Sequence, residues 1–333
     1  MSDRAKLLIS ILFIAAIILT IGLTRFYFDV TKNNGKIGSD DKIEDLLQSF
    51  GDMQVFRNPS GYCGVIDADG AVVIEPEWME VLDITPNIVL VSRRIGKDVL
   101  IGGIDYEENI VLPFVYSEFR NLGGGYKAGH VAADGSCIIY DSAYRMAFPT
   151  GYDEAAYDNS FLILTAEGSS FWYSVGDAAP GLRRAELKTP VGSQTLSWRL
   201  SNQVYLSGLT EQDLLRVSRC VTAYMDMLLA DDFSSLASVT TSDYLSGLSK
   251  PGTMPGARID RVFGFSFSSQ DKETYDLAFS AEYMPAGVRE GSQMVHMHLL
   301  FRRGTDNRMI LTSANLNFQS VEPPAPSETD EEE

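Results

Sequence analysis

Cysteine and histidine are scarce in this chain of 333 residues, which has three of each. The cysteines stand far apart and form no C-x-x-C pair, which argues against a disulfide framework and against a thiolate metal site. They are Cys63, Cys137 and Cys220. We therefore predict no metal site, no cofactor and no cofactor-binding residue. We expect Cys63 and Cys137 to be buried strand residues.

Positive charge and catalytic motifs are also scarce. The chain has 27 lysines and arginines against 45 aspartates and glutamates, which gives a formal net charge of −18. Such a chain repels the phosphates of nucleic acids, so we predict no nucleic-acid partner. No G-x-S-x-G motif is present, and the glycine runs at 102–103 and 123–125 lack the Lys-Ser/Thr of a phosphate-binding loop. We predict no catalytic residue and no enzymatic activity.

One long hydrophobic run is present, from Leu7 to Leu23. At about 1.5 Å per residue, this run nearly crosses a hydrocarbon core of about 30 Å. Bulky residues follow it instead of a small-x-small cleavage site, which favours an anchor over a cleaved signal peptide. We predict a cytoplasmic tail over 1–6, a transmembrane helix over 7–24 and the membrane as a partner. The protein would be a single-pass cell-membrane protein with an extracytoplasmic body.

Residues 25–55 are predicted to form a juxtamembrane linker that ends in a short helix. Within Asp41–Phe50, the apolar residues stand at helical spacing, at positions 43, 46, 47 and 50. Asp41 and Glu44 form the pattern of a helix cap, and Gly51 follows as a stop signal.

The next region repeats itself three times. Each unit has a short apolar strand ending in aspartate, a turn, and a second apolar strand. An aromatic residue lies eleven positions after each aspartate, and the aspartates are 38 and then 36 residues apart. The aspartate and aromatic pairs are Asp67 and Trp78, Asp105 and Tyr116, and Asp141 and Tyr152. Hairpin units of this kind bury their apolar faces by stacking on their neighbours.

This pattern resembles the WG-repeat family over about residues 60–175. Family units read roughly Trp-Gly-Tyr-Ile-Asp, a glycine turn, Val-Ile-Pro-Pro and a Tyr-Asp pair, which matches Tyr152-Asp153 here. The chain departs from the family because Cys63, Ile101 and Cys137 replace the signature tryptophan. The resemblance implies a β-rich interaction scaffold without catalytic residues, and we place it over 56–190.

The second half reads as two helices followed by four strands. The helices are predicted over Thr210–Leu229 and Asp232–Leu248, and the strands over 259–268, 274–283, 293–302 and 309–318. This order predicts an α+β cone over 191–320, so the fold class is mainly β plus α+β. It resembles the nuclear transport factor 2-like superfamily, which contains both enzymes and non-catalytic modules. Residues 321–333 hold six carboxylates and are predicted to be a disordered acidic tail.

The most favoured function is therefore a membrane-anchored scaffold that binds a protein, peptide or envelope ligand through the repeats and the cone. The alternative is a hydrolase- or isomerase-like enzyme with His296 or His298 as its acid–base group. These two histidines project from the same side of a strand, and Asp260 or Asp276 could serve as the partner carboxylate. A third reading is a plain spacer, which would expose no apolar patch on the repeats.

Overall fold

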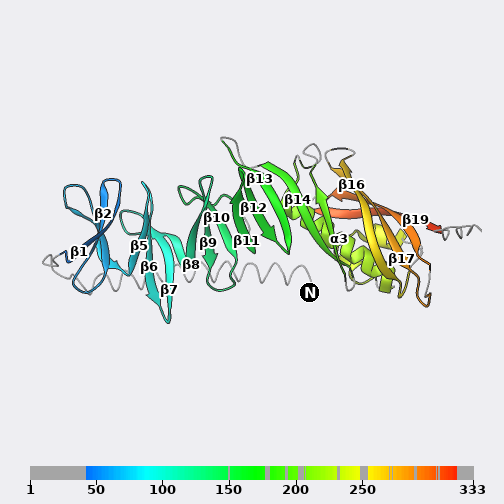
Figure 1. Cartoon of the computed structure of the whole chain (residues 1–333), viewed down its shortest axis with the longest axis horizontal. Coiled ribbons are helices and arrows are strands. Elements are labelled where there is room, and N and C mark those ends of the chain that lie inside the picture. Colours follow the sequence, from blue (N-terminus) through cyan, green and yellow to red (C-terminus); the bar gives the residue numbers. More distant parts are fainter. Residues whose placement is uncertain are drawn as a thin grey trace, which may run out of the picture. The chain divides into compact units, whose positions relative to one another are not determined.

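The computed structural model describes the body of the chain (Figure 1). The described residues are 43–148, 151–176, 181–191, 194–201, 206, 208–230, 233–247, 254–269, 271, 273–288, 291–304, 306 and 308–320. The predicted cytoplasmic tail (1–6), anchor (7–24) and acidic tail (321–333) lie outside them. Within the described ranges, no helix combines the length and the apolar character needed to cross a membrane. The structure therefore gives no support to the predictions of a transmembrane helix, a membrane partner and a cell-membrane location, and we do not retain them.

The described chain is mostly β and forms four antiparallel sheets. The first sheet has the order β1 (Asp45–Phe50), β2 (Met53–Arg57), β3 (Cys63–Ile66) and β4 (Val72–Trp78). The second runs, from one edge to the other, β5 (Glu80–Ile84), β6 (Val89–Ile95), β7 (Asp98–Ile104), β8 (Ile110–Gly123), β9 (Tyr126–Val131) and β10 (Cys137–Asp141). The third has the order β11 (Glu154–Asp158), β12 (Phe161–Ala166), β13 (Ser169–Ser174), β14 (Gly181–Val191) and β15 (Gln194–Leu200). The fourth has the order β16 (Arg258–Ser269), β17 (Thr274–Met284), β18 (Gln293–Arg303) and β19 (Met309–Ser320).

The chain divides into two compact units. The first unit ends at Gly151 and the second begins at Tyr152, except that Leu122–Gly124 belongs to the second. The boundary that we predicted at residue 190 instead falls within the hairpin of β14 and β15, where Pro190 pairs with Thr195. Pro190 thus lies within a pair of strands rather than at the end of a domain.

Within the first unit, the strands group into layers that are out of phase with the sequence repeat. Layer 1 is β1–β4, layer 2 is β5–β7 with Ile110–Tyr116 of β8, and layer 3 is the rest of β8 with β9 and β10. The last strand of layer 1, β4, ends at Trp78, and the chain continues after one residue as β5 of layer 2. The last strand of layer 2 is the first half of β8, which continues without a break into layer 3. The repeat aromatics Trp78 and Tyr116 lie at these crossings, and both are fully buried.

The core of the first unit lies between layers. Val55, Cys63, Val65 and Ile74 of layer 1 pack against Val81, Val89, Val91 and Ile104 of layer 2. Trp78 stacks on Phe114 at a ring-centroid distance of 5.7 Å. The glycines at the second repeat position allow close packing, because a Cβ on Gly102 would lie 2.7 Å from the ring of Phe114. Each layer is thus stabilised mainly by its neighbour.

The second unit contains the long helix α3 (Glu211–Ala230), which contacts β14 and β19 (Figure 1). Its start is capped: the Asp213 main-chain N–H donates to Thr210 Oγ1, and the Thr210 N–H donates to Asp213 Oδ2. Arg303 of β18 then forms two hydrogen bonds with the Asp213 carboxylate, at 2.9 and 3.0 Å. The bounds of helix α3 and of the strands β16–β19 lie within two residues of the predicted ones.

The predicted α+β cone is nevertheless wrong. Instead of a second helix over 232–248, the described part of this stretch has only a 3₁₀ turn, Leu236–Ser238, and the short helix α4 (Ser242–Gly247). In the stretch 232–248, serine and threonine side chains form hydrogen bonds with nearby main-chain groups. Ser238 Oγ donates to the Ser235 carbonyl, and the Tyr244 N–H donates to Thr241 Oγ1. Such bonds compete with a continuous helix. In addition, α3 contacts β14, which belongs to a separate five-stranded sheet rather than to the meander.

The short helix predicted over Asp41–Phe50 is also wrong, because residues 45–50 form strand β1. Asp45 pairs with Arg57 and Phe50 pairs with Met53 across the two-residue turn at Gly51, which adopts a positive φ of 59°. Pairing with β2 overrides the helical spacing of the apolar residues, because cross-strand contacts outweigh intrinsic propensities of a few tenths of a kcal/mol.

Candidate binding surface

The three repeat turns share one hydrogen-bond pattern. In each, the aspartate Oδ1 accepts hydrogen bonds from the main-chain N–H groups two and four residues later, at 2.7–3.1 Å. The residue three positions after the aspartate has a positive φ in every case: 81° at Gly70, 62° at Glu108 and 60° at Tyr144. The aspartates Asp67, Asp105 and Asp141 are therefore committed to the turns.

An exposed apolar side chain follows each of these turns. It stands five residues after the aspartate, where the chain pairs back across the turn: Val72 and Ile110 begin β4 and β8, and Met146 forms an isolated bridge to Tyr140. The three residues are Val72, Ile110 and Met146, which are 50%, 37% and 57% exposed. Their cross-strand partners Ile66, Ile104 and Tyr140 are buried. We call Val72, Ile110 and Met146 the apolar ladder. Isolated exposed apolar residues are common on proteins, but the same position in three consecutive repeats is a pattern.

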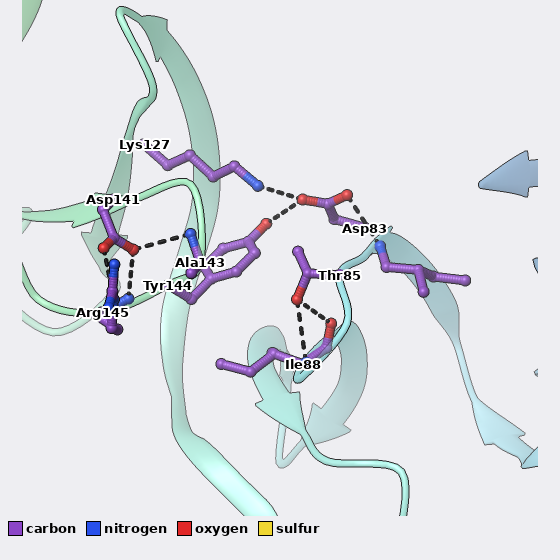
Figure 2. Close-up of polar contacts among 9 residues, drawn as sticks. Asp83, Thr85, Ile88, Lys127, Asp141, Ala143, Tyr144 and Arg145 are labelled. Carbon is purple, nitrogen blue, oxygen red and sulfur yellow. Dashed lines mark hydrogen bonds and ion pairs between the residues drawn. The ribbon is translucent and has the colours of Figure 1, made fainter. Parts of the chain in front are cut away.

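A polar cluster joins layers 2 and 3 (Figure 2). Asp83 of β5 accepts a hydrogen bond of 2.6 Å from the Tyr144 hydroxyl and an ion-pair contact from Lys127 of β9. The Lys127 Nζ atom also lies 4.0 Å from the centroid of the Tyr144 ring, which is a cation–π distance. The other oxygen, Asp83 Oδ1, accepts the main-chain N–H of Ile84 at 2.9 Å. We call Asp83, Lys127 and Tyr144 the interlayer clamp.

The electrostatics of the clamp favour a structural role. Burial alone would raise the pKa of Asp83, but hydrogen bonds from Lys127 and Tyr144 and the charge of Lys127 outweigh it, so the pKa lies below its usual value. Burial and the Asp83 carboxylate raise the pKa of Tyr144 far above its usual value. A carboxylate that stays charged and a phenol that stays protonated exchange no proton near neutral pH.

The two histidines of the alternative enzymatic reading lie on β18, on the side opposite its buried residues. Val295, Met297 and Leu299 are buried, whereas His296 and His298 alternate with them and point the other way. His296 Nδ1 lies 2.7 Å from Ser280 Oγ. His298 Nδ1 lies 3.6 Å from Asp276 Oδ2, which exceeds hydrogen-bond distance, and its side chain is more than half exposed. The structure brings His298 and Asp276 near each other, on the exposed face of the sheet.

A second buried polar cluster lies in the C-terminal unit. Glu211, the first residue of α3, is 5% exposed and accepts hydrogen bonds from the hydroxyls of Tyr152, at 2.9 Å, and Tyr173. Burial and the Glu211 carboxylate raise the pKa of Tyr173 strongly. The aromatic residue of the third repeat thus holds the start of a helix, where a negative side chain is also favoured by the helix dipole.

No group of three potential metal-ligating side chains occurs in the part of the chain that the structure describes. The predicted burial of Cys63 in β3 and Cys137 in β10 is confirmed, and Cys220 of α3 is buried as well. Burial raises the pKa of the Cys137 and Cys220 thiols to about 11, so both stay protonated and unreactive at neutral pH.

Sequence reasoning located the turns but missed both the apolar ladder and the clamp. The ladder residues were interpreted only as strand residues. One signal was present, since each repeat places a large apolar residue five positions after its aspartate. The clamp had a weaker signal: Tyr144 stands where the first repeat has Gly70, a position that requires positive φ.

Comparison with known proteins adds little. No protein-family model matches the chain, and no curated protein matches it. Among solved structures, the chain is similar to the crystal structure of Kluyvelomyces marxianus Hsv2, with 7% identity over 83% of this chain and 99% of that chain. The TM-score is 0.23, so this likeness carries no argument about fold or function. The resemblances to WG repeats and to the nuclear transport factor 2-like superfamily stay predictions.

Proposed function

We propose that this chain is a non-catalytic scaffold that binds an extended protein segment across its repeat turns. The observation that carries the proposal is the apolar ladder, in which Val72, Ile110 and Met146 expose large apolar side chains at one repeat position. A plain spacer has no use for such a surface, because exposed apolar side chains reduce solubility. Repeat scaffolds commonly present one contact per repeat to an extended ligand.

The geometry of stacked sheets defines the ligand. Sheets that pack face to face lie about 10 Å apart. A segment in the extended polyproline II conformation has three residues per turn and rises about 3.1 Å per residue, so every third side chain lies on the same side, about 9 Å from the last. A bound segment of this kind would therefore contact successive ladder residues with every third side chain. The first two turns beside the ladder carry two and three acidic residues, whereas the third pairs Asp141 with Arg145, and the chain as a whole has a net charge of −18. We expect a ligand with apolar residues at steps of three and with lysine or arginine between them.

The proposal is tested by selecting peptides from a random library on the purified protein. The perturbed protein carries Val72→Asp, Ile110→Asp and Met146→Asp together. Its control is Val99→Asp, which changes an equally exposed apolar residue at the β6–β7 hairpin, away from the ladder. Selected peptides should show the predicted spacing, bind the control normally and lose at least about tenfold in affinity for the triple variant. Peptides that bind the triple variant as tightly as the native protein would refute the proposal.

The enzymatic alternative makes a separate prediction. If His298 acted as an acid–base group with Asp276, a substrate would have to bind on the open face of the C-terminal sheet. The 3.6 Å separation and the exposure of the ring give little support to such a site. An activity screen with hydrolase and isomerase substrates that found turnover abolished by His298→Gln would favour the enzyme and contradict the scaffold.

A further inference from the structure

A surface cavity of about 390 Å³ lies beside helix α3 in the C-terminal unit. One side of α3 and the residues at the start of β19 line it, through Gln212, Asp213, Arg216, Arg219, Arg308 and Met309. Residues 212, 216 and 219 are four and three positions apart, so they lie on the same side of the helix. Half of the lining residues are arginines, although the chain as a whole has a net charge of −18. The cavity is therefore a local concentration of positive charge on an acidic chain.

Two of the lining side chains are fixed in place by hydrogen bonds. Arg216 Nη2 donates to the Ser238 carbonyl at 2.8 Å, and Arg216 Nε donates to the Met309 carbonyl at 3.4 Å. These bonds use two of the five N–H groups of an arginine, and both acceptors are neutral, so the guanidinium keeps its charge. The lining carboxylate, Asp213, accepts two hydrogen bonds from Arg303, which neutralises it. Arg216 is thus a pre-organised cation, which loses little side-chain entropy when it binds an anion.

The other two arginines form ion pairs that an anion can displace. Arg219 pairs with Glu167, but both side chains are about half exposed. Arg308 Nε lies 3.6 Å from Asp306 Oδ2, beyond hydrogen-bond distance, and both of these side chains are more than half exposed. Water screens exposed pairs of this kind, so they contribute little stability. Both arginines can therefore turn to an anion in the cavity at small cost.

We propose that this cavity binds the phosphate group of a small molecule, as free phosphate or as a phosphate ester. Guanidinium groups hold phosphate oxygens in paired, charge-assisted hydrogen bonds, and three guanidinium groups suit the several oxygens of a phosphate better than the two of a carboxylate. The volume of the cavity falls in the range of small-molecule sites. Gln212 lies in the first turn of α3, where the helix dipole also favours an anion. Charges more than about 8 Å away are largely screened in physiological salt, so the net charge of the whole chain does not prevent binding.

The proposal is tested by phosphorus NMR of inorganic phosphate with the purified full chain, because exchange with a bound state broadens the phosphate signal. Arg308→Gln removes one of the three guanidinium groups. Its control is Arg302→Gln, which changes an exposed arginine of β18 whose Nη2 also lies 3.6 Å from a carboxylate oxygen, that of Glu273. We expect Arg308→Gln to weaken phosphate binding at least about tenfold and the control to bind phosphate as the native protein does.

A second variant separates binding from folding. Gln212→Glu adds a carboxylate to the cavity in the first turn of α3, where a negative side chain suits the helix dipole. Gln212 is exposed, so the thermal unfolding temperature of the variant should not fall. Phosphate binding should nevertheless weaken at least about tenfold, because the added charge repels the anion.

Glycerol phosphate distinguishes the two sources of the phosphate group. Tighter binding than that of inorganic phosphate would assign an ester as the ligand, and equal binding would assign free phosphate. The proposal is overturned if the native protein, Arg308→Gln and Gln212→Glu broaden the phosphate signal equally, since phosphate would then bind outside the cavity. An unbroadened signal with the native protein would also overturn it. None of these results bears on the apolar ladder, which belongs to the first unit.

Discussion

The replacement of Tyr144 by phenylalanine tests the interlayer clamp most cleanly. It removes the hydroxyl that donates to Asp83 at 2.6 Å and leaves the ring, its contact with Lys127 and its backbone unchanged. A hydrogen bond to a charged group contributes about 1.5–3 kcal/mol. The Asp83 side chain is 27% exposed and keeps Lys127 as a partner, so water can replace part of the loss. We expect a destabilisation of about 1–2 kcal/mol.

Replacing Tyr144 by glycine compares the backbone strain at this position with the stabilisation that the tyrosine ring provides. Tyr144 adopts a φ of 60°, and glycine would relieve this strain by about 1 kcal/mol. Tyr144→Gly, however, also removes a ring that is only 4% exposed, which typically costs about 3–5 kcal/mol. The net loss should be about 2–4 kcal/mol, larger than for Tyr144→Phe.

The measurement is native-state hydrogen exchange of the β9 and β10 amides in the full chain, which reports the stability of layer 3 directly. It also has a pH signature. Because the folded pKa of Asp83 is lowered, its stabilisation is present above the usual aspartate pKa of 3.8 and is lost as pH falls through the folded value. The difference between native protein and Tyr144→Phe should shrink below that pH. A Tyr144→Gly variant as stable as the native protein, or a Tyr144→Phe variant with no effect at pH 7, would refute the clamp.

Three further predictions follow from other sites. Gly102→Ala should destabilise the first unit by about 1–3 kcal/mol in urea unfolding, because the added Cβ would collide with Phe114. The control is Gly135→Ala in an open turn, where the added Cβ meets no atom and the only cost is the strain of a positive φ. A thiol reagent at pH 8 should leave Cys137 and Cys220 unmodified until the protein is unfolded, and rapid labelling of the native protein would contradict their burial. The raised pKa of Tyr173 means that the C-terminal unit should lose stability as pH rises above about 10, the usual tyrosine value, and that Tyr173→Phe should weaken this loss. A thermal melt series in alkaline buffers checks the last prediction.

Local patterns predicted local structure well. The turn aspartates, helix α3 and the strands β16–β19 all follow from patterns of residues close in sequence. The predictions that failed depend on distant partners. Residues 45–50 look helical alone and become a strand because β2 lies beside them. The segment after α3 looks helical by its apolar spacing, yet Thr240 bonds the distant Leu311 carbonyl and draws this segment to β19.

The candidate surface also combines a feature that depends on nearby residues with features that depend on distant ones. The sequence repeat gives the equivalence of Val72, Ile110 and Met146, but their exposure follows from the packing of layers and could not be deduced from any one unit. The clamp joins residues 44 and 61 positions apart in sequence, and a single sequence carries no sign of that contact.

The central claim is that three consecutive repeats bind one extended segment. Its most direct test is hydrogen exchange of the full chain with and without a peptide selected on the native protein. We expect simultaneous protection around the three ladder residues, Val72, Ile110 and Met146, with no change at the β6–β7 hairpin. Protection confined to one repeat, or located on the exposed face of β18 near His298, would contradict it.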